Sequence, residues 1–215
     1  MRRELTSSVL AIVIFTLVLG LAYPLVMTGV GQVLWPNKAD GSQVERDGKV
    51  VGSRLIGQDF QRPVLGPDGE PQEDEEGNPV LEADPRYFQS RLSVTGYSAN
   101  VTFLNNLGPN SKDLRDLFRE NLATYLDRER PFNPGLRRGD VPPDAVQTTG
   151  SGVDPHISEA NARIQARRVA EERGLPLERV MELVDENTDG RALGVLGEPG
   201  VNVLELNLAV DEEAA

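Results

Sequence analysis

The amino-acid sequence contains one long stretch without charge, Leu5–Asn37, bounded by Glu4 and Lys38. Within it, Val9–Val26 reads VLAIVIFTLVLGLAYPLV and is almost wholly apolar. A charge-free apolar run of about 18 or more residues can cross the roughly 30 Å hydrocarbon core of a bilayer as a helix. The sequence after Lys38 is polar, acidic and interrupted by Gly and Pro. We therefore predict one membrane-spanning helix followed by a soluble domain.

The predicted anchor takes residues 1–35, with the span at about 8–27. The rest of the 215-residue chain, 36–215, is long enough for one domain with its own core. Aromatic residues make up only 5% of the chain, so this core should consist mainly of Val, Leu and Ile. The predicted fold is a single N-terminal transmembrane helix followed by one α/β (α+β) soluble domain.

A secretory signal peptide is the alternative interpretation of this N-terminus, because Arg2 and Arg3 form a short positive region before the apolar run. However, the run is longer than the usual apolar region of about 7–15 residues. The sequence Tyr23–Met27 offers no clear small-x-small cleavage site. Trp35 stands where an interfacial aromatic residue is expected. These features favour an uncleaved anchor.

Positive charges predict the orientation of the anchor. Arg2 and Arg3 flank one end, whereas the first positive residues on the other side are Lys38 and Arg46. The positive-inside rule therefore places the N-terminus in the cytoplasm and residues 36–215 outside it.

The span also contains a stripe of small or helix-interrupting residues. Thr16, Gly20 and Pro24 recur at four-residue spacing, and such a stripe allows another helix to approach closely. Contact with a partner helix and ordinary contact with lipid are both open interpretations of this stripe.

The composition excludes several classes of function. The formal net charge is −12, which argues against a nucleic-acid partner, because nucleic acid requires clustered Lys and Arg. The chain has no Cys, so disulfides, thiol catalysis and Cys metal sites are excluded. We expect an acidic, Cys-free domain that suits export.

The remaining segments combine strand and helix signals. The alternation of Leu204, Leu206, Leu208 and Val210 predicts a half-buried strand, and Gly174 is a typical helix stop. The predicted elements are a strand or hairpin over Gly48–Gln58, helices from Asn110 or Ser111 to Pro131, from Pro155 to Arg173 and from Pro176, and strands over Ala145–Thr149 and Asn202–Val210.

An acidic segment, Gly66–Glu82, reads GPDGEPQEDEEGNPVLE and is typical of a solvated or disordered loop. A calcium loop is the alternative interpretation of its acids Asp68, Glu70, Asp74 and Glu76. Their spacing does not match that of an EF-hand loop. The loop interpretation is therefore favoured.

The sequence GSGVDPH contains the best candidate site. With Asp154 as an N-cap and Pro155 as the first helical residue, the backbone of Gly150, Ser151 and Gly152 could cradle an anion. The phosphate motif GxxxxGK[ST] is absent, no Lys or Arg is adjacent, and Asp154 would repel phosphate. A tight strand-to-helix turn is the favoured interpretation.

His156 is the only histidine in the chain. Ser151, Asp154 and His156 include the residue types of a hydrolytic triad, but they are too close in sequence for its usual geometry. The nucleophile elbow of hydrolases is also missing. We expect His156 to form a local hydrogen bond within the turn, and we expect no metal site and no firmly bound cofactor.

Five segments carry a family resemblance. The most specific is Thr149–Ser158, and the others are Gly52–Phe60, Tyr87–Arg91, Asn106–Asn110 and Val201–Asn207. In this order they resemble the C subunit of the bacterial Kdp potassium-transporting ATPase. The motif residues of this resemblance are Gly150, Ser151, Gly152, Asp154, Pro155 and His156. The departures from the family pattern are Leu92 in place of Pro, Asn105 in place of Ser, and the acidic insertion 66–82.

The resemblance implies a non-catalytic accessory subunit of a high-affinity, ATP-driven potassium uptake complex in the bacterial inner (plasma) membrane. The implied partners are a channel-like potassium-binding A subunit, a P-type ATPase B subunit, a small F subunit and membrane lipid. The family's C subunit is described as a catalytic chaperone for ATP use by the B subunit, with ATP and potassium handled by the complex. Because ATP is cytoplasmic and the domain is predicted to lie outside, we expect an indirect effect. From the residues alone, an anchored extracytoplasmic hydrolase and a binding module unrelated to transport are the alternatives.

Overall fold

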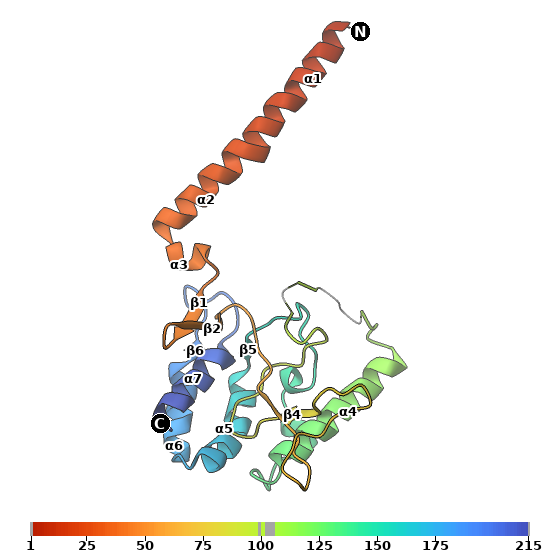
Figure 1. Ribbon diagram of the computed structural model, residues 1–215, viewed down its shortest axis with the longest axis vertical. Coiled ribbons are helices and arrows are strands. Elements are labelled where there is room, and N and C mark those ends of the chain that lie inside the picture. Colours follow the sequence, from red (N-terminus) through yellow and green to blue (C-terminus); the bar gives the residue numbers. More distant parts are fainter. Residues whose placement is uncertain (1, 99, 102–105, 215) are drawn as a thin grey trace. The chain divides into compact units, whose positions relative to one another are not determined.

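The computed structural model describes residues 2–98, 100–101 and 106–214 (Figure 1). Asn105, one of the departures from the family pattern, lies outside the described residues. The chain divides into two compact units, Met1–Ser53 and Arg54–Ala215. The predicted boundary at residue 35 separates the membrane anchor from the soluble domain. It is a boundary of another kind and stays a prediction.

The first unit begins with one long apolar helix, Arg2–Leu34. It consists of α1 (Arg2–Leu17), a π-helical turn η1 (Val18–Ala22) and α2 (Tyr23–Leu34). This confirms the predicted N-terminal helix, which at 33 residues is long enough to span a bilayer.

The π-turn has a physical cause in Pro24, which lacks a backbone N–H and crowds the preceding turn. The N–H of Tyr23 instead bonds Val18 O, five residues back. A Cβ at Gly20 would lie 3.9 Å from Thr16 Cγ2, so these two residues of the predicted stripe share one face.

The first unit ends with a short helix and a hairpin. Helix α3 (Pro36–Ala39) precedes strands β1 (Gln43–Arg46) and β2 (Lys49–Ser53), which pair antiparallel. The turn residues Asp47 and Gly48 both have positive φ, 52° and 72°, as two-residue hairpin turns require. The hairpin predicted near Gly48–Gln58 is therefore present, but it lies earlier in the chain.

The second unit is an α+β assembly. Its long helices are α4 (Lys112–Glu129), α5 (Glu159–Arg173), α6 (Leu177–Glu186) and α7 (Val203–Glu213), with short 3-10 helices η2 (Arg138–Asp140) and η3 (Pro143–Ala145). A hairpin of β3 (Gln61–Pro63) and β4 (Leu81–Ala83) and a three-stranded antiparallel sheet complete it. The order of the sheet is β5 (His156–Ile157), β7 (Gly200–Asn202) and β6 (Thr188–Asp189).

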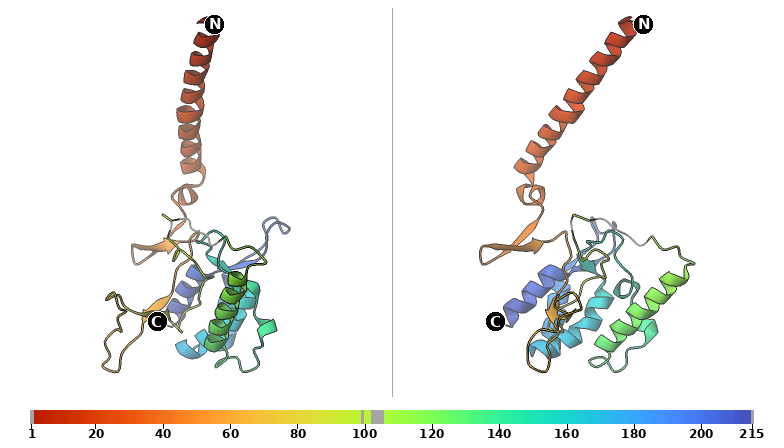
Figure 2. Two further views of the ribbon diagram at one scale, coloured as in Figure 1. Left: turned by 90° about the vertical axis from the view of Figure 1, so that its right-hand side faces the viewer. Right: turned by 45° about the vertical axis from the view of Figure 1, so that its right-hand side comes forward.

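The core lies among α5, α6, α7 and β7 and is mainly aliphatic, as predicted. Phe88 is the buried aromatic residue of this cluster. The other buried members are Ile157, Ala162, Ala166, Val169, Ala170, Val180, Leu183, Val184, Val201, Val203, Leu206 and Val210. Figure 2 shows the helices around this core from two further directions.

The strand predicted over Asn202–Val210 is wrong, because this segment forms helix α7. The side chain of Asn202 accepts the N–H of Glu205 and caps the helix. The buried residues are Val203, Leu204, Leu206, Asn207 and Val210, a helical spacing. The alternation was misleading because Val203, Leu206 and Val210 also fall at helical spacing, so the same apolar residues satisfy both periods.

The start predicted at Pro155 for the helix that ends at Arg173 is also wrong. His156 and Ile157 pair with β7, and α5 begins at Glu159 with Ser158 as its N-cap. The Ser158 hydroxyl accepts the N–H of Asn161. The predicted stop at Gly174 is confirmed, since this residue has φ 66° and forms the C-cap.

Other boundaries agree in part. Ser111 caps α4 as predicted. The segment Ala145–Thr149 does not form the predicted strand: its start belongs to η3, and within the described part of the chain it forms one isolated bridge, between Leu92 and Thr148. Prolines 142 and 143 favour the 3-10 turn here over a strand.

The acidic insertion 66–82 is a solvent-exposed double turn with bridges at Leu65–Pro71 and Glu73–Pro79. Asp74 accepts the N–H groups of Glu76 and Asn78. The bond from Asn78 leads the causes that lower the pKa of the Asp74 carboxyl. Across the described residues, no group of three or more His, Asp or Glu side chains is placed to hold a metal ion.

Candidate functional site

The glycine turn around residues 149–156 is held by neighbouring segments. The N–H of Thr149 donates to Leu92 O at 2.8 Å, and the N–H of Gly57 donates to Val153 O at 2.9 Å. The Ser93 hydroxyl donates to Gly152 O at 2.7 Å. Residues from three distant parts of the chain thus meet at this turn.

Two positions in this region require glycine. Gly152 has φ +77°, and a Cβ there would lie 2.9 Å from Thr95 Oγ1. A Cβ at Gly57 would lie 2.5 Å from the Tyr97 ring and 2.7 Å from Asp154 O. Glycine here therefore serves close approach of segments, which is the favoured structural interpretation of the motif.

A chain of alternating charges runs from the turn to the sheet. Arg91 Nη1 lies 2.9 Å from Asp154 Oδ2, and Asp154 Oδ1 accepts the N–H of His156 at 3.0 Å. His156 Nε2 lies 3.2 Å from Asp189 Oδ2. Arg54 continues the chain, at 3.9 Å from Asp189 Oδ1 and 2.7 Å from Glu205 Oε1. We call this set of six side chains the charge chain.

The electrostatics of the charge chain favour its ionised forms. The hydrogen bond to Asp154 raises the pKa of His156; partial burial opposes this, and Asp189 adds to it. Burial by itself raises the pKa of Asp154, but hydrogen bonds from His156 and Arg91 outweigh it and the net pKa is lowered. His156 therefore favours its protonated form between two carboxylates.

The predicted anion cradle lacks its structural premise, a helix N-terminus. The helix begins at Glu159, well after Gly150, Ser151 and Gly152. The neighbouring cavity of about 340 Å³ is lined by Asp144, Asp154, Asp189 and Glu198 as well as by Arg91 and His156. This excess of carboxylates repels anions.

Ser151 and His156 have separate partners. Ser151 Oγ lies 3.2 Å from Thr149 Oγ1 and accepts the N–H of Val153 at 3.2 Å. The His156 ring faces Asp154 and Asp189. The prediction of a local hydrogen bond for His156 is confirmed by its contacts with Asp154, but Asp189 is a partner that the sequence did not indicate.

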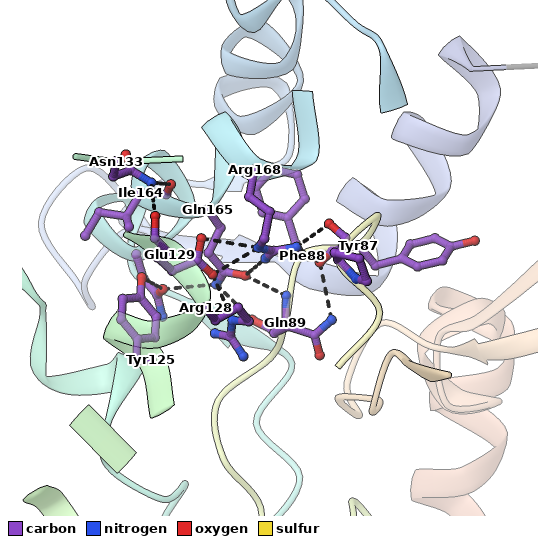
Figure 3. A network of polar contacts seen from close by, with 12 residues as sticks. Tyr87, Phe88, Gln89, Tyr125, Arg128, Glu129, Asn133, Ile164, Gln165 and Arg168 are labelled. Carbon is purple, nitrogen blue, oxygen red and sulfur yellow. Dashed lines mark hydrogen bonds and ion pairs between the residues drawn. The ribbon is translucent and has the colours of Figure 1, made fainter. Parts of the chain in front are cut away.

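A second polar cluster, absent from the sequence predictions, lies in the interior (Figure 3). The side chains of Glu129 and Arg168 are both 0% exposed, and Arg168 Nε lies 3.1 Å from Glu129 Oε1. Arg168 also donates to the carbonyl oxygens of Pro85 and Tyr87 and to Gln165 Oε1. These contacts join α4 and α5 to the segment that precedes Arg91.

Amide side chains fasten the same segment. Gln165 Oε1 accepts the N–H of Gln89 at 2.8 Å, and Gln165 Nε2 donates to Gln89 O at 3.1 Å. Asn207 makes the equivalent pair of bonds to the backbone of Phe88, at 2.8 and 2.9 Å. The backbone of Tyr87–Arg91 is thereby held in place, which positions Arg91 against Asp154. One sequence signal was available, since Tyr87–Arg91 is among the segments of the family resemblance.

Comparison with known proteins decides the family. The family model KdpC, described as K+-transporting ATPase, c chain, matches residues 5–212. The chain belongs to this family. The matched range contains most of the long apolar helix, the glycine turn and the polar cluster around Arg168.

Individual KdpC proteins are similar over their whole length. Each of three relatives is named potassium-transporting ATPase KdpC subunit. That of Rhodospirillum rubrum is 45% identical, covering 99% of this chain and 97% of its own. That of Bradyrhizobium diazoefficiens is 43% identical with 100% of both chains covered, and that of Streptomyces coelicolor is 43% identical, covering 99% and 94%. The chain is accordingly an accessory subunit of a potassium-transporting ATPase complex.

Proposed function

We propose that the chain is a non-catalytic subunit that assists assembly of the complex and acts as a catalytic chaperone, promoting ATP use by a P-type ATPase subunit. The observation that carries this proposal is that the Ser, His and Asp side chains of the glycine turn are engaged in structural hydrogen bonds and ion pairs. His156 pairs with Asp154 of its own turn and with Asp189 of β6, and Ser151 Oγ accepts the N–H of Val153 within the turn. This arrangement supports a scaffold and offers no nucleophile paired with a base.

The proposed orientation places the N-terminus in the cytoplasm and the acidic domain outside. Arg2 and Arg3 precede the apolar helix and support this orientation. Because ATP is cytoplasmic, the effect on ATP use passes through assembly or through the membrane helix. The proposed partners are a channel-like potassium-binding A subunit, the P-type ATPase B subunit, a small F subunit and lipid, with ATP and potassium handled by the complex.

The charge of the second unit supports a role near a cation entrance. Residues 54–215 carry 30 Asp and Glu against 17 Lys and Arg. A surplus of negative charge raises the local concentration of cations. The unit therefore attracts potassium without a dedicated binding site.

Orientation is tested by labelling a single cysteine. The chain has no Cys, and Glu75 lies in the exposed insertion, so Glu75→Cys provides a clean probe. A membrane-impermeant thiol reagent should label it in cells whose outer envelope has been opened. A cysteine inserted between Met1 and Arg2 is the matched control and should react only after lysis. The reverse pattern would place the domain in the cytoplasm and restore direct contact with ATP.

The transport role is tested by deleting the chain from cells that depend on this ATPase for potassium. Growth at limiting potassium and ATP turnover by the purified remainder should both fall, and both should return with the wild-type chain. Normal uptake without the chain would refute the proposal. Restoration by His156→Ala would agree with a non-catalytic role, whereas a complete loss with intact assembly would contradict it.

A further inference from the structure

An exposed apolar loop lies between strands β6 and β7. We call Ala192–Gly197 the tip loop; it reads ALGVLG. Leu193 is 91% exposed, Val195 73% and Leu196 59%. Figure 2 shows this segment projecting from the body of the second unit. Single exposed leucines are common on protein surfaces, but three large apolar side chains gathered in one short loop are typical of a binding surface.

The tip loop has a defined backbone. Ala192 and Leu196 exchange two backbone hydrogen bonds, at 2.8 and 2.9 Å, and the N–H of Gly194 donates to Arg191 O at 3.0 Å. Leu193 has φ 54°, a left-handed conformation that is unfavourable for a branched aliphatic residue. The loop thus holds Leu193 in a left-handed backbone conformation while its side chain stays almost wholly in water.

The charges around the tip loop distinguish between lipid and protein as its partner. The loop has no charged or aromatic residue, and Arg191 at its base pairs with Glu198 at 2.7 Å. Binding to a lipid surface generally combines apolar side chains with Trp or Tyr or with unpaired Lys and Arg, and the tip loop supplies only the apolar part. The acidic surplus of residues 54–215 also repels anionic lipid. These features favour an uncharged apolar recess in a protein.

We propose that the tip loop docks into an apolar, uncharged recess of another subunit of the potassium-transporting ATPase. Leu193, Val195 and Leu196 fill the recess, and the paired Arg191 and Glu198 lie at its rim. Small, central apolar anchors surrounded by polar residues are typical of protein interfaces. This proposal rests on the proposed function, because it requires that the chain assembles with such a subunit.

The first test uses the double variant Leu193→Ser/Leu196→Ser in the full complex. Burial of each leucine contributes roughly tenfold or more to affinity, so the variant should retain at most about one tenth of the partner subunits that co-purify with wild type. The matched control is Leu65→Ser/Leu81→Ser, whose leucines are 59% and 50% exposed elsewhere in the unit. The control should assemble like wild type.

The outcomes separate this proposal from the proposed function. A wild-type chain that fails to co-purify with ATPase subunits refutes the proposed function. A wild-type chain and a tip variant that co-purify equally well overturn only the docking proposal. Thermal unfolding of each purified chain in detergent identifies loss of folding as a separate cause.

A second test does not depend on a destabilising change. A photo-crosslinking amino acid is placed at position 193, and at position 65 as the control, within the assembled complex. Position 193 should crosslink to another subunit at several times the yield of position 65. Crosslinks to lipid, to a second copy of this chain or to nothing would overturn the proposal.

Discussion

His156 lies between two carboxylates that belong to different segments. Asp154 precedes it in the glycine turn, and Asp189 ends strand β6. The contact between His156 and Asp154 was predictable from the sequence as a local hydrogen bond, because the two residues are only two positions apart. The contact with Asp189 was not, because 33 residues separate the two side chains.

This geometry predicts a pH-dependent stability. The pKa of His156 is raised in the folded chain, so its stabilisation is complete below the unfolded pKa near 6.5 and is lost as pH rises through the folded pKa. The thermal unfolding midpoint of wild type in detergent should fall between about pH 5.5 and about pH 8.5 more than that of His156→Gln. Equal falls in both proteins would contradict this assignment.

We expect alanine at the two glycines of the family motif, Gly150 and Gly152, to change the free energy of unfolding by different amounts. At Gly152 alanine meets positive φ and Thr95 Oγ1, so Gly152→Ala should lower the free energy of unfolding by about 1–3 kcal/mol. Gly150 is the matched control, since no atom lies within 4 Å of a Cβ there. Denaturant unfolding measures both, and an equal loss at both positions would refute the steric argument.

At the scale of secondary elements, sequence signals succeeded where local chemistry decides. Ser111 and Gly174 mark helix ends through their own side-chain or backbone preferences. Helix α7 was mistaken for a strand because its apolar residues satisfy both periods, and burial against α6 and β7 decides the matter. The buried face of α5 could not be identified from the hydrophobic pattern either, because Gln165 and Arg168 are polar yet buried.

The buried pair between α4 and α5 carries a strong prediction. Arg168→Met removes the fully buried partner of Glu129 and should cost about 3 kcal/mol of unfolding free energy, the lower end for breaking a buried pair, because Arg128 still lies 2.8 Å from Glu129 Oε1. Arg163 lies on the same helix, and its pair with Asp185 is exposed, so Arg163→Met should change stability by about 0–1 kcal/mol. Denaturant midpoints compare the two variants. Similar losses would mean that the buried pair contributes no more than a surface pair.

At the scale of the whole molecule, the stripe of small residues on the apolar helix is a predicted contact surface for a partner helix. Thr16 and Gly20 share one face, and Gly20 lies within the π-turn before Pro24. If this face contacts a partner helix, Gly20→Leu should reduce co-purification of the other ATPase subunits by about tenfold, because the bulky side chain separates the helices. Gly29→Leu, which lies off the stripe, should leave it unchanged. Full assembly of Gly20→Leu would assign this face to lipid.

The sequence by itself determined the membrane helix and the family of this protein. A span can be recognised from composition because the bilayer sets both its length and its polarity, and the five segments of the KdpC resemblance are local motifs. Only the tertiary structure decided that α7 is a helix, that Asp189 meets His156 and that Arg168 lies buried against Glu129. These outcomes depend on contacts between residues far apart in the chain, where burial outweighs local preference.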